Sequence, residues 1–185
     1  MKIEYFELYK IKIKDNMKRN IFLIAIILIA VVAVSGCINS PIDNINNNMK
    51  ELNTDITEGD TDYNAAINYI NNKDFVSGTD NIQIAKDKFN DAEEKLSNIE
   101  EYKSSLNESI YINYLDLVTE EVALKKQACD ELYLALQYYT NNDISSGNSY
   151  AQSANSIMNQ AIVLQGERNQ IVENNPDLFK KASII

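Results

Sequence analysis

The chain contains no histidine and no tryptophan, and it has only two prolines, five glycines and two cysteines among 185 residues. The lack of histidine removes the commonest general base and metal ligand. It also removes Ser-His-Asp and Cys-His catalytic sets, zinc motifs with histidine and the Glu-x-x-His pairs of di-iron bundles. Glycine-rich phosphate loops are absent as well. We therefore expect no enzymatic activity, no metal and no cofactor.

Breakers of regular structure are rare beyond residue 38, where four glycines and two prolines remain. Both prolines, Pro41 and Pro176, lie near the ends of this segment. Long uninterrupted helices are the natural expectation for such a composition. Asparagine is abundant and lowers intrinsic helicity, so helix packing must supply most of the stability.

The chain has one long apolar run, residues 21–36, which reads "IFLIAIILIAVVAVSG" and follows Lys18 and Arg19. A helix that spans a bilayer needs about 20 apolar residues. A positive flank, a shorter apolar core and an exit of small residues are typical of a secretory signal peptide. Residues 1–36 are therefore left out of the fold prediction.

The run ends in Val34, Ser35, Gly36 and Cys37. This ending resembles a lipobox, the site at which prokaryotic membrane lipoproteins are cleaved and lipidated on the cysteine. The resemblance implies that Cys37 is the lipid attachment site and that the three preceding residues are the cleavage motif. The alternative is an uncleaved anchor helix. Either one places residues 38–185 on the extracytoplasmic face of the cell membrane, with residues 37–40 as a short tether.

Sixteen residues precede Met17, which would be unusual for a lipoprotein signal. A start at Met17 gives a compact leader, so we favour a start assigned too early at Met1. The alternative is an extended cytoplasmic tail.

Charge is distributed unevenly. Residues 1–37 carry six basic and three acidic side chains, which leaves a net charge of −13 for residues 38–185. Nucleic-acid binding requires a basic footprint, so this balance argues against it. It also argues against lying flat on anionic lipid, because the acidic charge favours a solvated domain. The expected partners are the membrane, through the N-terminal anchor, and other cell-surface proteins.

Apolar residues recur at steps of three and four between residues 41 and 175, which predicts an all-α antiparallel bundle of about four long helices. Ser40 and Pro41 suit the start of the first helix. Residues 57–60, "TEGD", interrupt its stripe, so one bent helix or two helices are both open. The later stripes are Ile82, Ala85, Phe89, Ala92, Leu96 and Ile99; then Tyr111, Tyr114, Val118, Val122, Cys129, Leu132, Leu136 and Tyr139; then Ala151, Ala154, Met158, Ala161 and Leu164.

Two turns resemble each other, "AAINYINNKDFVSG" at residues 65–78 and "ALQYYTNNDISSG" at 135–147. Deleting Lys73 aligns them and pairs Tyr63 with Tyr133. Similar residues also pair on both sides of the two turns: Leu52 with Val122, Ala65 with Ala135, Ala85 with Ala154, and Ala92 with Ala161. We therefore expect a duplicated hairpin with a period near 70, covering about 41–105 and 108–173 and followed by a tail at 176–185. Chance similarity of turns is the alternative.

The turn also slightly resembles a tetratricopeptide repeat, but the period is far from 34 and the helices are too long. Within each turn we expect Asn-Asn to end one helix in left-handed backbone. Phe75 or Ile144 should pack into the hairpin end, and Ser77 or Ser146 should cap the next helix. Ala85 and Ala154 should lie at helix–helix contacts.

The remaining candidate sites have ordinary structural explanations. Asp60, Asp62 and Asn64 resemble the start of a calcium loop but lack its later glycine and glutamate, so we interpret them as a helix N-terminus. The Glu pairs at 93–94, 100–101 and 120–121 are expected on solvated faces. The tyrosines suit core and boundary packing rather than an aromatic binding patch.

Two further residues bear on modification. Cys129 has no partner once Cys37 belongs to the leader, so no internal disulfide is expected in the mature form. We interpret Cys129 as a buried helix residue rather than a reactive thiol. Asn107, in the sequon Asn107-Glu108-Ser109, is a candidate glycosylation site in a predicted loop.

These features favour a lipid-anchored extracytoplasmic lipoprotein whose helical bundle is a structural or protein-interaction module. The alternative is an extracytoplasmic bundle that binds a small ligand or acts as a sensor. That alternative requires an interior cavity lined by tyrosine and asparagine, which sequence alone cannot establish.

Overall fold

The computed structural model describes residues 41–103, 106 and 109–179. These residues form five helices: α2 (Pro41–Asn71), α3 (Phe75–Lys103), α4 (Ser109–Thr140), α5 (Ile144–Asn174) and the short α6 (Pro176–Phe179). The described part of the chain contains no strand. The expected all-α fold with four long helices is therefore confirmed.

The first helix, α2, is continuous over its 31 residues, which settles the question left open by residues 57–60. The threonines around that segment bond back into the helix: the hydroxyls of Thr57 and Thr61 donate to carbonyls four residues earlier, at 2.8 Å each. Such back-bonding satisfies polar side chains without ending a helix. Gly59 sits where α2 meets α3, and a Cβ there would lie 2.6 Å from the Phe89 ring.

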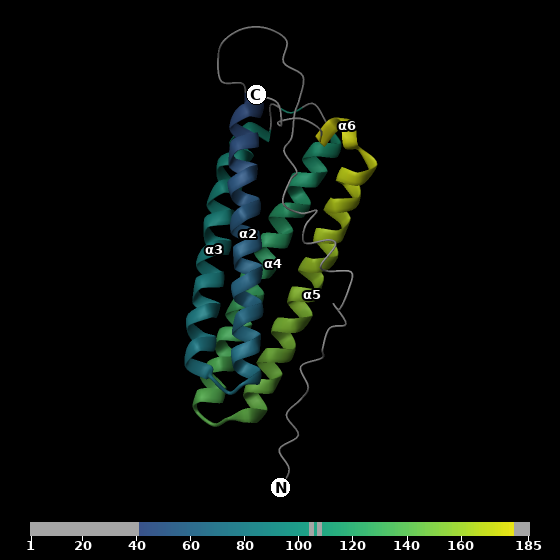
Figure 1. The fold of residues 1–185 in the computed structure, drawn as a ribbon. Helices are drawn as coiled ribbons and strands as arrows, with labels where there is room; N and C mark the ends of the chain where they lie inside the picture. The colour runs from purple at the N-terminus through teal and green to yellow at the C-terminus, as the bar shows by residue number, and fades with distance from the viewer. Residues whose placement is uncertain (1–40, 104–105, 107–108, 180–185) are drawn as a thin grey trace.

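The long helices form two antiparallel hairpins, α2–α3 and α4–α5, which meet mainly where α3 packs against α4. Both hairpin turns lie at the same end of the bundle (Figure 1). The backbones of α2 and α5 do not approach each other closely within the described residues. Figure 1 shows α5 separating from α2 toward the end that carries α6. The bundle is therefore closed at its turn end and splayed at the other.

The core has two parts that follow this shape. The turn-end cluster takes buried apolar residues from all four long helices: Tyr63, Ala66 and Ile70; Ile82, Ala85 and Phe89; Ala128, Cys129, Leu132, Ala135, Leu136 and Tyr139; and Ala151, Ala154, Met158 and Ala161. Ala85 and Ala154 are fully buried there, so their predicted contact positions are confirmed.

The second part, the α6-end cluster, lies toward the splayed end. Its buried members come from α2, α3, α4 and α6: Ile45, Met49, Leu52 and Ile56; Ala92, Leu96 and Ile99; Tyr111, Tyr114, Leu115, Val118 and Val122; and Phe179. α5 contributes only the partly buried Ile171 and Val172. The segment predicted as a tail thus supplies a buried ring, Phe179, at the end where α5 lies apart from α2.

The two turns have the same hydrogen bonds. The amide of Asp74 donates to the carbonyl of Tyr69, and that of Asp143 to the carbonyl of Tyr138, at 2.9 Å in both. Equivalent positions therefore differ by 69 residues on both sides of the turn, and no residue is deleted. The predicted upstream pairs at a spacing of 70 are wrong: Tyr63 is buried whereas Tyr133 is exposed.

Left-handed backbone occurs once in each turn, at Lys73 (φ 62°) and Asn142 (φ 61°). The prediction that Asn-Asn supplies it holds for the second turn, whereas in the first the residue is the lysine that the sequence alignment deleted. A residue with positive φ closes the helix C-terminus by redirecting its amide toward an earlier carbonyl. The two turns are therefore alike in backbone but not in the residue that bears the strain.

The helix caps differ from the prediction by three residues. Asp143 is the N-cap of α5, and its carboxylate accepts from the amide of Ser146 at 3.0 Å. Asp74 accepts likewise from the amide of Ser77 at 3.1 Å. The Ser77 hydroxyl, which donates to Asp74 at 2.7 Å, and the Ser77 amide hold the pKa of Asp74 below its usual range, and the Ser146 amide does the same for Asp143. Helices α3 and α5 thus begin one turn earlier than expected.

The hairpin end is packed as predicted. The Phe75 ring stacks on Tyr139 with centroids 5.3 Å apart, and Ile144 packs against the turn-end cluster. Tyr139 is fixed further by its hydroxyl, which donates to Asn148 at 2.9 Å. A Cβ on Gly147 would lie 2.5 Å from two atoms of this ring.

Two glycines of α5 should respond oppositely to the same change. Gly147→Ala should lower the free energy of unfolding by about 1–3 kcal/mol, because the Tyr139 ring is held from two sides. Gly166→Ala should raise it by about 0.5–1 kcal/mol, because its Cβ meets nothing within 4 Å and alanine favours a helix. Urea unfolding measures both. Equal effects of the two changes would contradict the described packing at the hairpin end.

Candidate functional site

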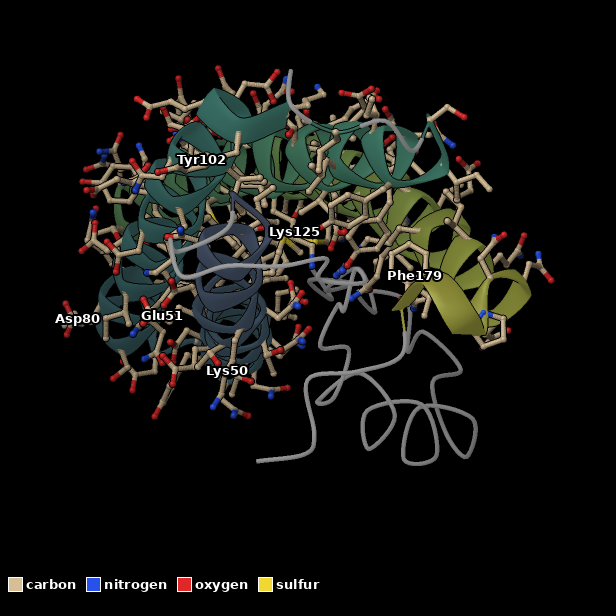
Figure 2. All side chains as sticks on the ribbon, turned by 90° about the horizontal axis from the view of Figure 1, so that it is seen from above. Lys50, Glu51, Asp80, Tyr102, Lys125 and Phe179 are labelled. Atoms are coloured by element: carbon tan, nitrogen blue, oxygen red, sulfur yellow. The ribbon has the colours of Figure 1, made fainter. Side chains whose placement is uncertain are left out.

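Four charged side chains lie between the two apolar clusters, and we call them the charged layer: Asp60, Glu121, Lys125 and Arg168. Glu121 and Lys125 are fully buried and Arg168 is 2% exposed. Burial of such groups is rare unless they are paired. Figure 2, seen along the bundle, places Lys125 among the inner side chains, whereas Lys50 and Asp80 lie at the periphery.

Lys125 binds acidic groups from two helices. Its Nζ lies 2.7 and 2.6 Å from the two carboxylate oxygens of Asp60 on α2. It also lies 3.0 Å from Oε1 of Glu121, one turn earlier on α4. The ammonium sits 5.8 Å from the centroid of the Phe89 ring on α3, within range of a cation–π contact. Lys125 therefore connects α4 with α2 and α3.

Arg168 connects α5 with the rest of the layer. Its Nε lies 2.5 Å from Oε2 of Glu121, an ion pair without the angle of a hydrogen bond. The guanidinium also donates to the hydroxyl of Tyr114 at 3.3 Å and to the amide oxygen of Asn53 at 3.4 Å. Asn53 lies on α2, so this bond crosses from α5 to a helix whose backbone α5 does not closely approach.

The layer is neutral overall, with two acidic and two basic groups. Burial raises the pKa of Asp60, while Lys125 opposes that rise. Burial lowers the pKa of Arg168, but the Glu121 carboxylate and the Tyr114 hydroxyl together outweigh it, and the net pKa is raised. Arg168 therefore stays charged, and a loss of Glu121 would leave its charge buried without an ionic partner.

The arrangement suits structural work better than acid–base chemistry. Each carboxylate is occupied by a cation within 3.0 Å, so neither is poised to take a proton from a substrate. Among the described residues there is no group of three or more acidic or cysteine side chains placed to hold a metal ion. What the layer can do is fix the position of one hairpin on the other, the best-attested role of buried ionic groups.

The internal repeat makes this layer conspicuous. At the observed spacing of 69 residues, Glu121 corresponds to Leu52, Lys125 to Ile56 and Arg168 to Ile99, all of which are buried apolar residues. The second hairpin therefore carries charges at positions that the first fills with apolar side chains. A sequence alignment without the deletion of Lys73 would have revealed the layer.

Two predictions about acidic residues are corrected by these contacts. Asp60, Asp62 and Asn64 lie in the interior of α2 and not at a helix N-terminus, and Asp60 binds Lys125. Glu121 lies inside the bundle rather than on a solvated face. The other members of the three Glu pairs are exposed, as expected: Glu93, Glu94, Glu100, Glu101 and Glu120.

Cys129 is fully buried in the turn-end cluster, as predicted, and burial raises the pKa of its thiol. Tyr111 and Tyr114 are also buried, in agreement with packing roles. The predicted lipid attachment residue Cys37, its cleavage motif Val34–Gly36 and the candidate glycosylation residue Asn107 lie outside the described residues.

No family model, curated protein or solved structure matches this chain. None of the helices that the structure describes between residues 41 and 179 combines the length and the apolar content of a membrane span.

The repeat supplies the substitutions that test the charged layer. Glu121→Leu, Lys125→Ile or Arg168→Ile alone should each lower the free energy of unfolding by about 3–5 kcal/mol, because each leaves one uncompensated charge in the buried layer. The three together with Asp60→Asn should cost far less than the sum, since no charge is then left unpaired. Denaturant unfolding of these four variants and of the unsubstituted chain measures this. Additive losses would mean that the four side chains do not act as one unit.

Proposed function

We propose that this chain is a lipid-anchored extracytoplasmic protein whose helical bundle serves as a protein-interaction module at the membrane surface. The lipobox-like ending at Cys37 supports the anchor. The observation that carries the proposal is the start of α2 at Pro41, four residues later. Four extended residues span about 14 Å, so a lipid on Cys37 would hold this end of the bundle close to the bilayer.

The direction of the helices supports a bundle whose long axis points away from the membrane, upright or tilted, rather than a loosely tethered domain. α2 has 31 residues and so extends about 46 Å from its first residue to the hairpin turn. Both turns share the opposite end from the start of α2 (Figure 1). An anchor at Cys37 would therefore present the turns, and the sides of the long helices, to other proteins.

The interior favours binding through the outer surface. Its buried charges are neutralised by one another, and its apolar residues pack in two clusters on either side of them. A net charge of −13 beyond residue 37 keeps this surface solvated and away from anionic lipid. We therefore expect the bundle to bind other proteins through its outer surface.

The alternative of a ligand-binding or sensor bundle requires a cavity lined by tyrosine and asparagine. The rings of Tyr111 and Tyr114 instead stack at 6.2 Å, and Phe179 packs against both, at 5.9 and 5.2 Å between centroids. These rings contact one another rather than stand apart around a space, which weighs against the alternative.

The proposal predicts a lipid on Cys37 and an exposed turn on intact cells. Mass spectrometry of the membrane-extracted chain should find Cys37 as the modified N-terminal residue, and Cys37→Ala should leave an uncleaved precursor. Because two acyl chains hold a membrane firmly, the chain without substitutions should also resist extraction by salt.

In the same cells, Asn141→Cys at the turn should react with a bulky, membrane-impermeant maleimide. Ile110→Cys, near the start of α4 and 39% exposed, should react more slowly because the bilayer would lie close by. A mature chain that retains residues 21–36, or labelling that requires permeabilised cells, would refute the anchor or the location respectively.

A further inference from the structure

α5 differs from the other long helices in its charge. Only three of its 31 residues are charged, Glu167, Arg168 and Glu173, and Arg168 is buried. The helix has no charged residue from 144 to 166. By contrast, α3 carries eleven charged residues in 29. Protein surfaces normally carry about 25–35% charged residues, so a long uncharged helix on a strongly acidic body calls for an explanation.

The uncharged stretch has a well-defined exposed side. Its exposed residues recur at steps of three and four, which places them on one face of the helix. We call this the α5 outer face: Ser145, Ser149, Gln152, Ser156, Asn159, Gln160 and Val163. Val163 is 59% exposed, and Ile162 beside it is 44% exposed. The face is therefore polar but uncharged along most of its length, and its apolar residues lie at the end nearer α6.

Within the described part of the chain, the ion pairs at the surface are made by helices other than α5. Across the described residues, the pairs between helices outside the charged layer join α2 with α3 or α3 with α4, and all but the largely buried Lys95–Asp55 lie at the surface: Lys88–Glu58, Lys95–Asp55, Lys86–Asp130, Lys103–Asp116 and Lys126–Glu93. The one described pair made by α5 is buried, Arg168–Glu121. The acidic surface is thus concentrated on α2, α3 and α4, and α5 stands apart from it.

We propose that the α5 outer face is the contact between two copies of this chain. Each copy carries a net charge of −13 beyond residue 37, so two copies repel each other on every acidic side. The α5 outer face is where they can meet with least repulsion. Interface centres are depleted of charged residues in general. A two-fold contact needs only this one self-complementary surface.

The size of the face indicates a weak contact. Twenty-three helical residues, 144–166, extend about 35 Å, and a helix about 10 Å wide then offers roughly 350 Å² per copy. A stable interface buries about 800 Å² per partner. The dimer therefore depends on a high local concentration, which attachment to one membrane would supply. In this respect the inference rests on the proposed lipid anchor.

A shared membrane also fixes the geometry. Two copies anchored in one bilayer are related by an axis along the membrane normal, so their α5 helices run in the same direction. Residues at equal height then face each other, and Val163 approaches Val163 of the second copy. Because repulsion between the acidic bodies opposes the contact, association should increase as salt shortens the Debye length from about 30 Å at 0.01 M to about 8 Å at 0.15 M.

Cross-linking in native membranes tests this with the full chain. Val163→Cys and Ser156→Cys, seven residues apart on the α5 outer face, should give covalent dimers with a short bismaleimide, with several-fold more product at 0.15 M than at 0.01 M salt. Ile84→Cys on the charged α3, 47% exposed, is the matched control and should give little dimer. The unsubstituted chain reports any background from Cys37, since Cys129 is buried.

Added charge supplies the second measurement. Ser156→Glu in the Val163→Cys chain should reduce the dimer several-fold, whereas Ser156→Ala should leave it unchanged. Equal dimer from Ile84→Cys, a yield that falls with salt, or adducts with a different protein would each overturn the proposal. If no dimer forms while Cys37 carries a lipid, self-association is refuted and the proposed anchor stands. If Cys37 carries no lipid, the anchor itself is refuted.

Discussion

The arrangement of the two hairpins depends on one set of interactions, the buried ion pairs among Asp60, Glu121, Lys125 and Arg168. They lie at the level where the bundle changes from closed to splayed. On the turn side, alanines on α5 let it pack closely into a shared apolar core. On the other side α5 contributes no fully buried apolar residue, and Arg168 reaches back to α4 and α2 instead.

The charged layer also explains why a duplicated hairpin is not symmetric. In the first hairpin the equivalent positions hold the buried apolar residues Leu52, Ile56 and Ile99, and α2 packs against α3 as extensively as α4 packs against α5. Their charged counterparts in the second hairpin must be paired, and the pairing partners come from both hairpins. Buried ion pairs contribute little net stability but penalise every arrangement that leaves a charge alone. The layer therefore selects one position of α4–α5 on α2–α3, and the splayed end is filled by Phe179 from α6.

The helices could be predicted from the sequence because their apolar spacing is a local property, and nearly every stripe residue is buried. The charged layer could not, because Glu121 looks like any solvated glutamate until its counterpart is known. The deletion of Lys73 shifted the upstream repeat by one residue and paired Leu52 with Val122 instead of Glu121. That shift followed from identical letters, Asn-Asn, whereas the backbone places Lys73 and Asn142 at the same position. The caps were missed for a related reason, since Asp and Ser are both good N-caps and only the hydrogen bonds distinguish them.

The central claim is that Arg168 holds the splayed half of α5 to the rest of the bundle. Native-state hydrogen exchange of the unmodified chain and of Arg168→Leu tests this most directly, because exchange reports local opening residue by residue. The account predicts that protection falls in α5 beyond Ala161 and in α6, while amides at the turn end keep theirs. Unchanged protection beyond Ala161, or an equal loss in all four long helices, would contradict it.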